Sequence, residues 1–252
     1  MILKKNINKV FYLFLFSHLI LWTLTPSLSN TNLPLDTIEA LAWGSNLDWG
    51  FNKHPPFSAF AVEFFYKIFG SNDWAYYLLS QIFVLISFYF VWKFSNELLE
   101  DKTYSLLSVL LLAGIYFYNF TTPEFNVNVS QLPFWVLTVY FFWKGINFNE
   151  NKDWILFGIF SALGFLSKYL FLYLLVSIDL LFIYLIFFKK DRKFDFKYLI
   201  TAEVFLVALV PHFIWLTNNE FITITYGLAR TGLEQSSLIN HIQFPLIFIG
   251  KQ

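Results

Sequence analysis

Two acidic residues lie close together in the first long polar segment of the chain. Asp36 and Glu39 belong to the stretch Leu35–Trp43. If this stretch is helical, residues three positions apart share a face, so one carboxylate can accept a proton while the other positions it. The alternative is structural, because acidic side chains also stabilise the first turn of a helix through its dipole. Both interpretations stay open on spacing alone.

A cation and an imidazole follow in the segment Lys53-His-Pro-Pro56. The two prolines restrict the backbone, which holds Lys53 and His54 at the head of the next segment, Phe57–Gly70. That segment is too short to cross a membrane, and we predict a helix along the interface. A fixed cation suits a phosphate group. The alternative is an ordinary lysine that extends toward lipid headgroups before a proline turn.

Two later turns add further polar residues. Glu124 and Asn126 lie in Thr121-Thr-Pro-Glu-Phe-Asn-Val-Asn128, where capping of the following helix is the competing explanation. Lys168 lies in Gly164-Phe-Leu-Ser-Lys-Tyr169, between two apolar runs. It can pair with a carboxylate or an anionic ligand, or simply reach toward the headgroups.

Three other titratable residues fall in or near apolar runs. Asp179 and Glu203 lie inside them, where a central charge costs roughly 3 kcal/mol on insertion and implies a partner. His212, near the end of another run, either faces the external site or ends a helix. The four histidines are scattered, so no motif supports a metal site. We predict no cofactor, although a divalent metal stays possible without a motif.

Composition indicates a membrane protein with helical spans. Hydrophobic residues make up 57% of the 252 positions and charged residues only 13%, with a mean hydropathy of +0.56. Such a surplus of apolar side chains must face lipid. A net charge of zero without a long basic tract argues against nucleic acid as a partner. The absence of cysteine excludes disulfides and thiolate chemistry.

The apolar runs predict an all-α bundle of about seven transmembrane spans and part of an eighth. A helix needs roughly 20 apolar residues to cross about 30 Å of hydrocarbon. The predicted spans are Val10–Leu28, Trp74–Phe94, Tyr104–Asn119, Asn126–Gly145, Trp154–Tyr169, Phe171–Phe188 and Tyr198–Leu216, with an eighth from Ile242. We predict tight links between the third and fourth spans and between the fifth and sixth. The whole of residues 1–252 is then one transmembrane domain, with a first external loop at 29–73.

The positive-inside rule gives the orientation. A cytoplasmic N-terminus leaves only Lys53, Lys67, Lys168 and Arg230 outside. It places twelve basic residues inside: Lys4, Lys5, Lys9, Lys93, Lys102, Lys144, Lys152, Lys189, Lys190, Arg192, Lys193 and Lys197. The first run also resembles a secretory signal, but its length favours a retained span. The predicted location is the bacterial inner membrane, with the acidic loop in the periplasm.

Taken in order, these motifs resemble the GT-C membrane glycosyltransferases, in particular the dolichyl-phosphate-mannose protein mannosyltransferases and bacterial aminoarabinose transferases. The resemblance is carried by Asp36 with Glu39, Lys53-His-Pro-Pro56, Glu124-Phe-Asn126 and Leu166-Ser-Lys168. The segment Pro211–Phe221, which contains His212, is similar to a later periplasmic entry of that branch. Together these motifs extend over most of the chain.

The resemblance implies transfer of a sugar from a polyprenyl-phosphate donor to an acceptor hydroxyl, with inversion. Asp36 is then the general base, assisted by Glu39, and Lys53 and Lys168 bind the donor phosphate. His54, Glu124, Asn126 and His212 support the acceptor side. The implied partners are the lipid-linked donor, membrane lipids, and an acceptor that is a protein, a lipid or a glycan.

The sequence departs from the family pattern at three points. His54 interrupts the commoner Lys-Pro-Pro spacing, and Glu124 stands where many relatives have Asp. Family members are usually much longer, so we expect this chain to be a C-terminally truncated member in which the segment Phe221–His241 lacks support. Two other functions stay open: a transporter or flippase for a lipid-linked sugar that uses Asp179, and a non-catalytic assembly subunit.

Overall fold

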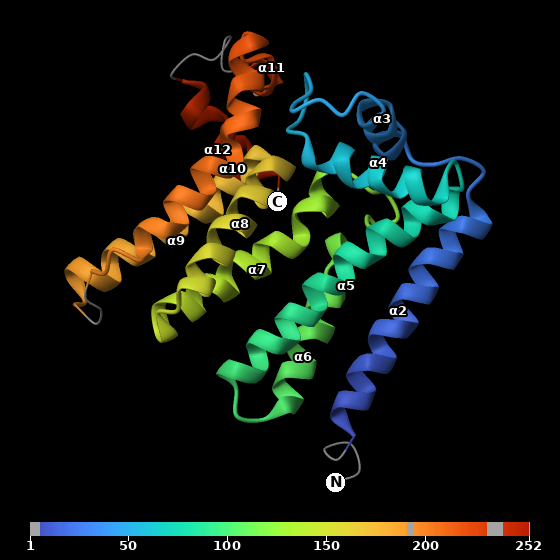
Figure 1. Cartoon of the computed structure of the whole chain (residues 1–252). Helices are drawn as coiled ribbons and strands as arrows, with labels where there is room; N and C mark the ends of the chain where they lie inside the picture. Colours follow the sequence, from blue (N-terminus) through green and yellow to red (C-terminus); the bar gives the residue numbers. More distant parts are fainter. Residues whose placement is uncertain (1–5, 191–193, 231–238, 252) are drawn as a thin grey trace.

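The structure is a computed structural model that describes residues 6–190, 194–230 and 239–251. The described residues are 80% helical, and they contain no β-strand. Figure 1 shows long helices packed side by side, with the short helices α3 and α4 across the upper end. The predicted all-α class is confirmed. Four of the predicted inside charges lie outside the described residues: Lys4, Lys5, Arg192 and Lys193.

Seven helices of the described chain form the body of the molecule, and four others lie toward its upper end (Figure 1). The body consists of α2 (Ile7–Ser29), α5 (Asp73–Leu98), α6 (Lys102–Ala113), α7 (Val127–Phe148), α8 (Asn151–Ser167), α9 (Leu172–Ile183) and α10 (Tyr198–Asn218). The helices toward the upper end are α3 (Leu35–Gly44), α4 (Phe57–Phe69), α11 (Ile222–Arg230) and α12 (Asn240–Gly250). A 3-10 turn before α9 and a π turn after it make one continuous stretch, Tyr169–Phe188.

Four helical stretches of the described chain are long and apolar enough to cross a membrane. They are Ile7–Ser29, Asp73–Leu98, Tyr169–Phe188 and Tyr198–Asn218, and each coincides with a predicted span. Helix α7 has 22 residues, which at the α-helical rise give about 33 Å. The predicted total of seven spans and a partial eighth stays a prediction.

The third predicted span, Tyr104–Asn119, is wrong in extent. Helix α6 has 12 residues and ends at Ala113, so it is only about 18 Å long. The Asn119 side-chain amide donates a hydrogen bond of 2.8 Å to the Ala113 carbonyl and satisfies a free acceptor at the helix end. The prediction from apolar composition extended the helix too far, because composition carries no information about such a cap.

The connection between α6 and α7 is therefore long rather than tight, and part of it is buried. Thr122 is fully buried. Its carbonyl accepts a hydrogen bond from the Ser80 hydroxyl, and its hydroxyl accepts one of 3.1 Å from the Gln81 amide. Irregular backbone needs such partners wherever water is excluded. This contact explains the adjacent polar pair, Ser80 and Gln81, within α5.

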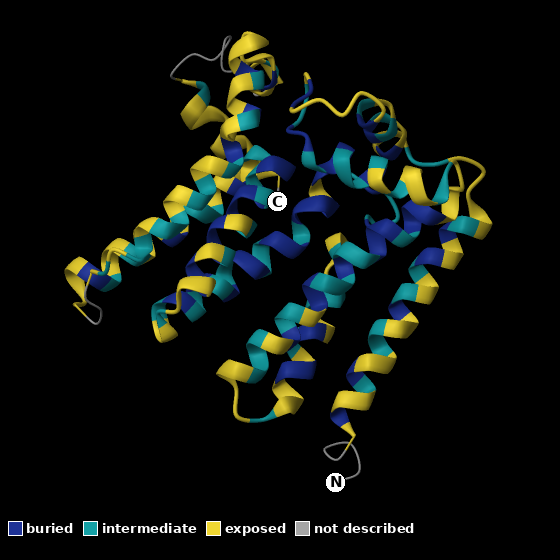
Figure 2. Cartoon of the chain, viewed as in Figure 1, coloured by how far each residue is buried: buried dark blue, intermediate teal, exposed yellow. Residues whose placement is uncertain are grey.

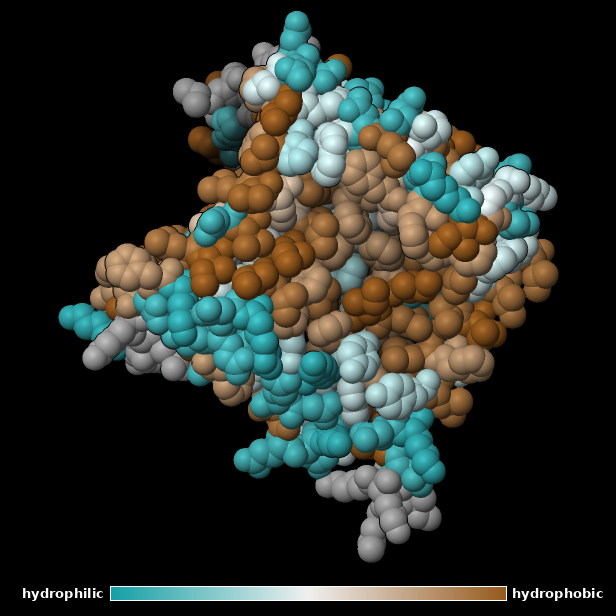
Figure 3. Space-filling view, viewed as in Figure 1, coloured by the Kyte–Doolittle hydropathy of each residue, from teal (hydrophilic) through white to brown (hydrophobic). Residues whose placement is uncertain are grey.

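Exposed apolar side chains cover the long helices. Figure 2 shows buried residues where helices meet and exposed residues on the outer faces. Figure 3 shows brown apolar surface across the middle of the molecule and teal hydrophilic groups toward its upper and lower ends. Leu13, Leu111 and Val207 are each 65% exposed. A band of this kind is typical of a surface in contact with lipid.

The first loop forms a compact cover made of α3 and α4. The two helices correspond to the predicted segments Leu35–Trp43 and Phe57–Gly70. They pack closely, because a Cβ atom at Gly44 would lie 2.8 Å from the Ala59 carbonyl oxygen. The glycine therefore sets the distance between the helices. The placement of α4 at the membrane interface stays a prediction.

Candidate active site

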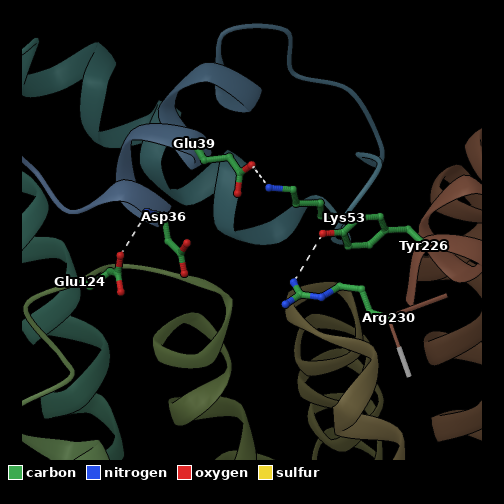
Figure 4. Close-up of polar contacts among 6 residues, drawn as sticks. All are labelled: Asp36, Glu39, Lys53, Glu124, Tyr226 and Arg230. Carbon is green, nitrogen blue, oxygen red and sulfur yellow. Dashed lines mark hydrogen bonds and ion pairs between the residues drawn. The ribbon is translucent and has the colours of Figure 1, made fainter. Parts of the chain in front are cut away.

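Helix α3 presents the two predicted carboxylates one turn apart. Asp36 lies in its first turn and is exposed, and Glu39 is half-buried. The backbone N–H of Asp36 donates a hydrogen bond of 3.1 Å to the Glu124 carboxylate (Figure 4). Glu124 comes from the turn before α7, so the structure brings two predicted motifs together across 88 positions of sequence.

Asn126 joins these two acidic residues. Its side-chain amide lies 3.4 Å from an Asp36 carboxylate oxygen and 3.5 Å from a Glu124 carboxylate oxygen. Its side-chain oxygen accepts hydrogen bonds from the backbone N–H groups of Asn128 (2.9 Å) and Val129 (3.2 Å) and so caps α7. Asn126 therefore caps α7, and the site role of this residue stays a prediction. The cap fixes the amide that faces both carboxylates.

Lys53 forms an ion pair with Glu39 (Figure 4). This hydrogen bond raises the pKa of Lys53 above its ordinary value, because the carboxylate favours the charged form. Pro56 occupies the N-cap position of α4, so Lys53 lies immediately before the helix, as its spacing from the prolines predicts. The ammonium group is thereby held on the side of α3 that carries Glu39.

A small pocket lies between α3, the head of α4 and the start of α7. Asp36, Glu39, His54 and Asn126 line it. The His54 imidazole packs with its edge against Trp43 at 5.9 Å between ring centres. Burial lowers the pKa of His54, and the neighbouring Lys168 lowers it further. The ring is therefore neutral near pH 7, so it can act as a hydrogen-bonding group.

The sequence did not single out Ser58, which also lines this pocket. It is 1% exposed, and its hydroxyl has no hydrogen-bond partner among the described residues. An unpaired buried hydroxyl is costly and marks a place where a ligand group or water can bind. Its only sequence signal is a small polar residue directly after Pro-Pro-Phe.

Lys168 approaches the same network from the end of α8. Its ammonium nitrogen lies 2.5 Å from the Asn128 side-chain oxygen. Burial lowers the pKa of Lys168, and the Asp36 carboxylate opposes this by favouring the charged form. A path of polar contacts thus runs from Lys168 through Asn128 and Asn126 to Asp36.

His212 has a different position from the other predicted residues. It is fully buried, and its Nδ1 lies 2.6 Å from the Trp49 carbonyl oxygen while its Nε2 lies 2.7 Å from the Tyr169 hydroxyl. Because a carbonyl only accepts, Nδ1 is the donor. Gly50 packs on the Trp215 indole, where a Cβ would lie 2.3 Å from a ring atom. These contacts attach the first loop to α10, and His212 is not among the residues that line the pocket beside Asp36.

Helix α11 contributes two residues that the sequence did not assign to the site. Arg230 lies 3.5 Å from the Tyr226 hydroxyl, and Figure 4 shows the Tyr226 hydroxyl on the side of Lys53. Arg230 entered the sequence analysis only as one of four external basic residues. The sequence indicated only that Arg230 lies in the segment after α10. The fold shows that this segment lies beside Lys53.

The site combines bridged carboxylates with cations. Its acidic side has Asp36 and Glu124 joined by an amide, and its basic side has Lys53 and Lys168. This arrangement suits proton abstraction beside an anionic group. Within the described residues, no group of three or more His, Cys, Asp or Glu side chains is placed to hold a metal ion.

Comparison with known families decides the identity. Residues 53–215 match the family described as dolichyl-phosphate-mannose-protein mannosyltransferase. The chain belongs to this family. The predicted GT-C resemblance is therefore confirmed, and the protein is a membrane-embedded member of this mannosyltransferase family. The match includes Lys53, His54, Glu124, Lys168 and His212, and it begins after α3.

Two curated relatives support the same group. The chain is 23% identical over 189 residues to the lipopolysaccharide core galacturonosyltransferase RgtA of Rhizobium johnstonii, covering 75% of this chain and 38% of that protein. It is 27% identical over 147 residues to the undecaprenyl phosphate-alpha-4-amino-4-deoxy-L-arabinose arabinosyl transferase of Wigglesworthia glossinidia brevipalpis, covering 55% of this chain and 25% of that protein. The chain thus spans less than half the length of either relative. No solved structure matches it significantly.

Proposed function

We propose that this mannosyltransferase-family protein transfers a sugar from a polyprenyl-phosphate donor to an acceptor hydroxyl. One observation carries the proposal: Asp36 is held beside Glu124 by Asn126, next to the two cations Lys53 and Lys168. A base and a phosphate-binding pair at one place are what glycosyl transfer from a phosphate ester requires. The names of both relatives, which are glycosyltransferases, support the same reaction class.

In the proposed mechanism Asp36 accepts the proton of the acceptor hydroxyl. The acceptor oxygen forms a bond to the anomeric carbon, while the bond from that carbon to the phosphate oxygen breaks with inversion. The leaving polyprenyl phosphate keeps the electron pair, and Lys53 and Lys168 stabilise its growing negative charge. Lys53 now pairs with Glu39, so donor binding replaces a carboxylate partner by a phosphate.

The remaining site residues have positioning roles in this proposal. Glu124 and Asn126 hold Asp36 in place, Glu39 and His54 border the acceptor, and His212 keeps the first loop against α10. The acceptor is a protein, a lipid or a glycan. We place the protein in the bacterial inner membrane, with a cytoplasmic N-terminus and residues 29–73 outside as the external loop of one domain. The distribution of basic residues supports this orientation.

The two alternatives have less support. A transporter that uses Asp179 and Glu203 requires a shared polar path, but Asp179 lines a pocket with mainly aromatic and aliphatic walls, and Glu203 is not among its lining residues. An assembly subunit has no need of a base and two cations in one network. The names of the relatives also favour an enzyme.

The proposal is tested by replacing Asp36 with Asn in the purified protein. The assay supplies polyprenyl-phosphate-linked mannose, galacturonate or aminoarabinose with a bacterial membrane extract as acceptor, and measures released polyprenyl phosphate. Loss of a general base lowers the rate by about 100- to 10,000-fold. Asp48→Asn is the matched control, because Asp48 is an exposed acid of the same loop. Full activity of Asp36→Asn would remove Asp36 as the base.

A further inference from the structure

A second pocket lies among α7, α8, α9 and α10, away from the candidate active site. Its volume is about 210 Å³. The part of α8 that lines it runs from Trp154 to Ser161, whereas Lys168 lies just beyond the last residue of that helix. The pocket therefore lies toward the opposite end of the bundle from Asp36, and its properties do not depend on the proposed glycosyl transfer.

Asp179 is the one acidic residue that lines this pocket. It belongs to the stretch Tyr169–Phe188, which is long and apolar enough to span a membrane. Asp179 is itself exposed where it lines the pocket, and no ion pair between described residues involves it. An ionisable side chain at membrane depth is costly unless it has a partner, and such residues mark functional sites.

Ser161 provides a second polar group without a partner. It is 2% exposed, its hydroxyl has no hydrogen-bond partner among the described residues, and it lines the same pocket. Several other helical serines bond to the carbonyl four residues earlier. Examples are Ser87 to Phe83 (3.1 Å), Ser167 to Leu163 (2.8 Å) and Ser177 to Tyr173 (2.7 Å). The Ser161 hydroxyl is instead left for a group inside the pocket.

The other walls are mainly aromatic. Phe182 of α9 and Tyr198 and Phe205 of α10 are among the lining residues, and the rings of Phe182 and Tyr198 meet edge to face at 4.7 Å. Aromatic faces attract organic cations, most strongly where water is excluded. A carboxylate among aromatic rings therefore favours an ammonium group over a neutral or anionic one.

We propose that this pocket binds the protonated amine of a membrane amphiphile. The ammonium group pairs with Asp179 and donates to the Ser161 hydroxyl, and the adjoining hydrocarbon packs against the aromatic rings. The size of the pocket favours a single chain over a partner helix, because a helix is about 10 Å wide and a volume of about 210 Å³ cannot admit one. Sites for small ligands commonly have this combination of apolar walls and a few convergent polar groups.

The test uses the whole protein in phosphatidylglycerol vesicles, which contain no amine. The probes are 11-bromoundecylamine and 11-bromoundecanol, whose bromine quenches nearby tryptophan fluorescence, and Trp154 lines the pocket. We expect half-maximal quenching of the wild type at an amine content about tenfold lower than for Asp179→Asn. The alcohol should quench both proteins equally. Comparing two proteins in the same vesicles cancels the attraction of the amine to the lipid headgroups.

Three further variants keep the result interpretable. Asp179→Glu retains the carboxylate and should keep the preference for the amine, which separates loss of charge from loss of fold. Ser161→Ala should weaken amine binding by a smaller factor than Asp179→Asn. Ser177 lies in α9, the helix that carries Asp179, and its hydroxyl already bonds to the Tyr173 carbonyl. Ser177→Ala should therefore bind the amine as the wild type does. Identical quenching curves with the amine for the wild type and Asp179→Asn would overturn the proposal.

Discussion

The polar residues at the upper end of the bundle and those in the pocket beside α9 differ in how the fold treats them. At the upper end, Asp36 contacts Asn126, Lys53 pairs with Glu39, and each partner comes from a different segment. In the pocket, Asp179 is exposed and forms no ion pair with a described residue, and the Ser161 hydroxyl has no hydrogen-bond partner among these residues.

This difference indicates two kinds of site. A reaction centre has to hold its groups in fixed positions before substrate arrives, and a network of hydrogen bonds does so at little cost. A binding pocket can leave polar groups unpaired if the ligand provides the partner, but the empty protein is then less stable. Removing Asp179 should therefore stabilise the protein, whereas changes at the upper end should lower its activity or its stability, and the following predictions test this contrast.

The largest effect is expected at Asp179. Replacing it with Leu removes an unpaired carboxylate from apolar surroundings and should stabilise the protein by roughly 3 kcal/mol, the cost of a central acidic residue on insertion scales. The measurement is reversible unfolding in phosphatidylglycerol vesicles without any amine.

Ser177→Ala is the control for this change, because Ser177 lies on the outer side of the same helix and bonds to its own backbone. Its stability should stay within about 0.5 kcal/mol of the wild type. A destabilised Asp179→Leu protein would show that Asp179 has a stabilising partner, and the contrast between the regions would fail.

Lys53 should show the next largest effect, this time as a loss. Lys53→Met keeps the length of the side chain but removes the cation that we assign to the donor phosphate. Removing one such stabilising donor lowers the turnover rate by about 100-fold. Lys67→Met is the matched control: Lys67 is an exposed residue of α4 that pairs with Glu63 at 3.7 Å. Equal activities of the two variants would separate Lys53 from the donor site.

Local sequence patterns were sufficient for much of the fold. Apolar runs located α2, α5 and α10 because a lipid-facing helix has to be apolar along its length. They failed at the end of α6, where the Asn119 amide caps Ala113. A cap depends on one side chain folding back, which mean hydropathy does not register.

The candidate site was predictable where its chemistry was local. Asp36, Lys53 and Lys168 stood out because acid spacing, paired prolines and a basic residue on the external side are visible along the chain. Ser58 and Tyr226 were missed. Their positions depend on how α4 and α11 pack against the first loop, and an unpaired hydroxyl is a property of the folded protein alone.

Asn126 allows the capping role and the site role to be separated. Asn126→Ala removes the α7 cap and the bridging amide and should destabilise the protein by about 1 kcal/mol. Asn126→Ser keeps a capping oxygen but has no amide to reach Asp36, so its stability should stay near that of the wild type. If the bridge positions Asp36, both variants lose activity by a similar factor of about ten. An active Ser variant would limit Asn126 to capping.

The smallest effect concerns pH and distinguishes the two lysines. Burial lowers the pKa of Lys168 below its ordinary value of 10.5, whereas the bond to Glu39 raises that of Lys53. Lys168 therefore loses its charge first as pH rises, so donor affinity should begin to fall below pH 10.5. Lys168→Arg keeps the charge throughout this range and should move the alkaline decline to higher pH. Donor KM measured from pH 8 to 10 checks this, and an unchanged profile for Lys168→Arg would exclude Lys168 as the group that titrates.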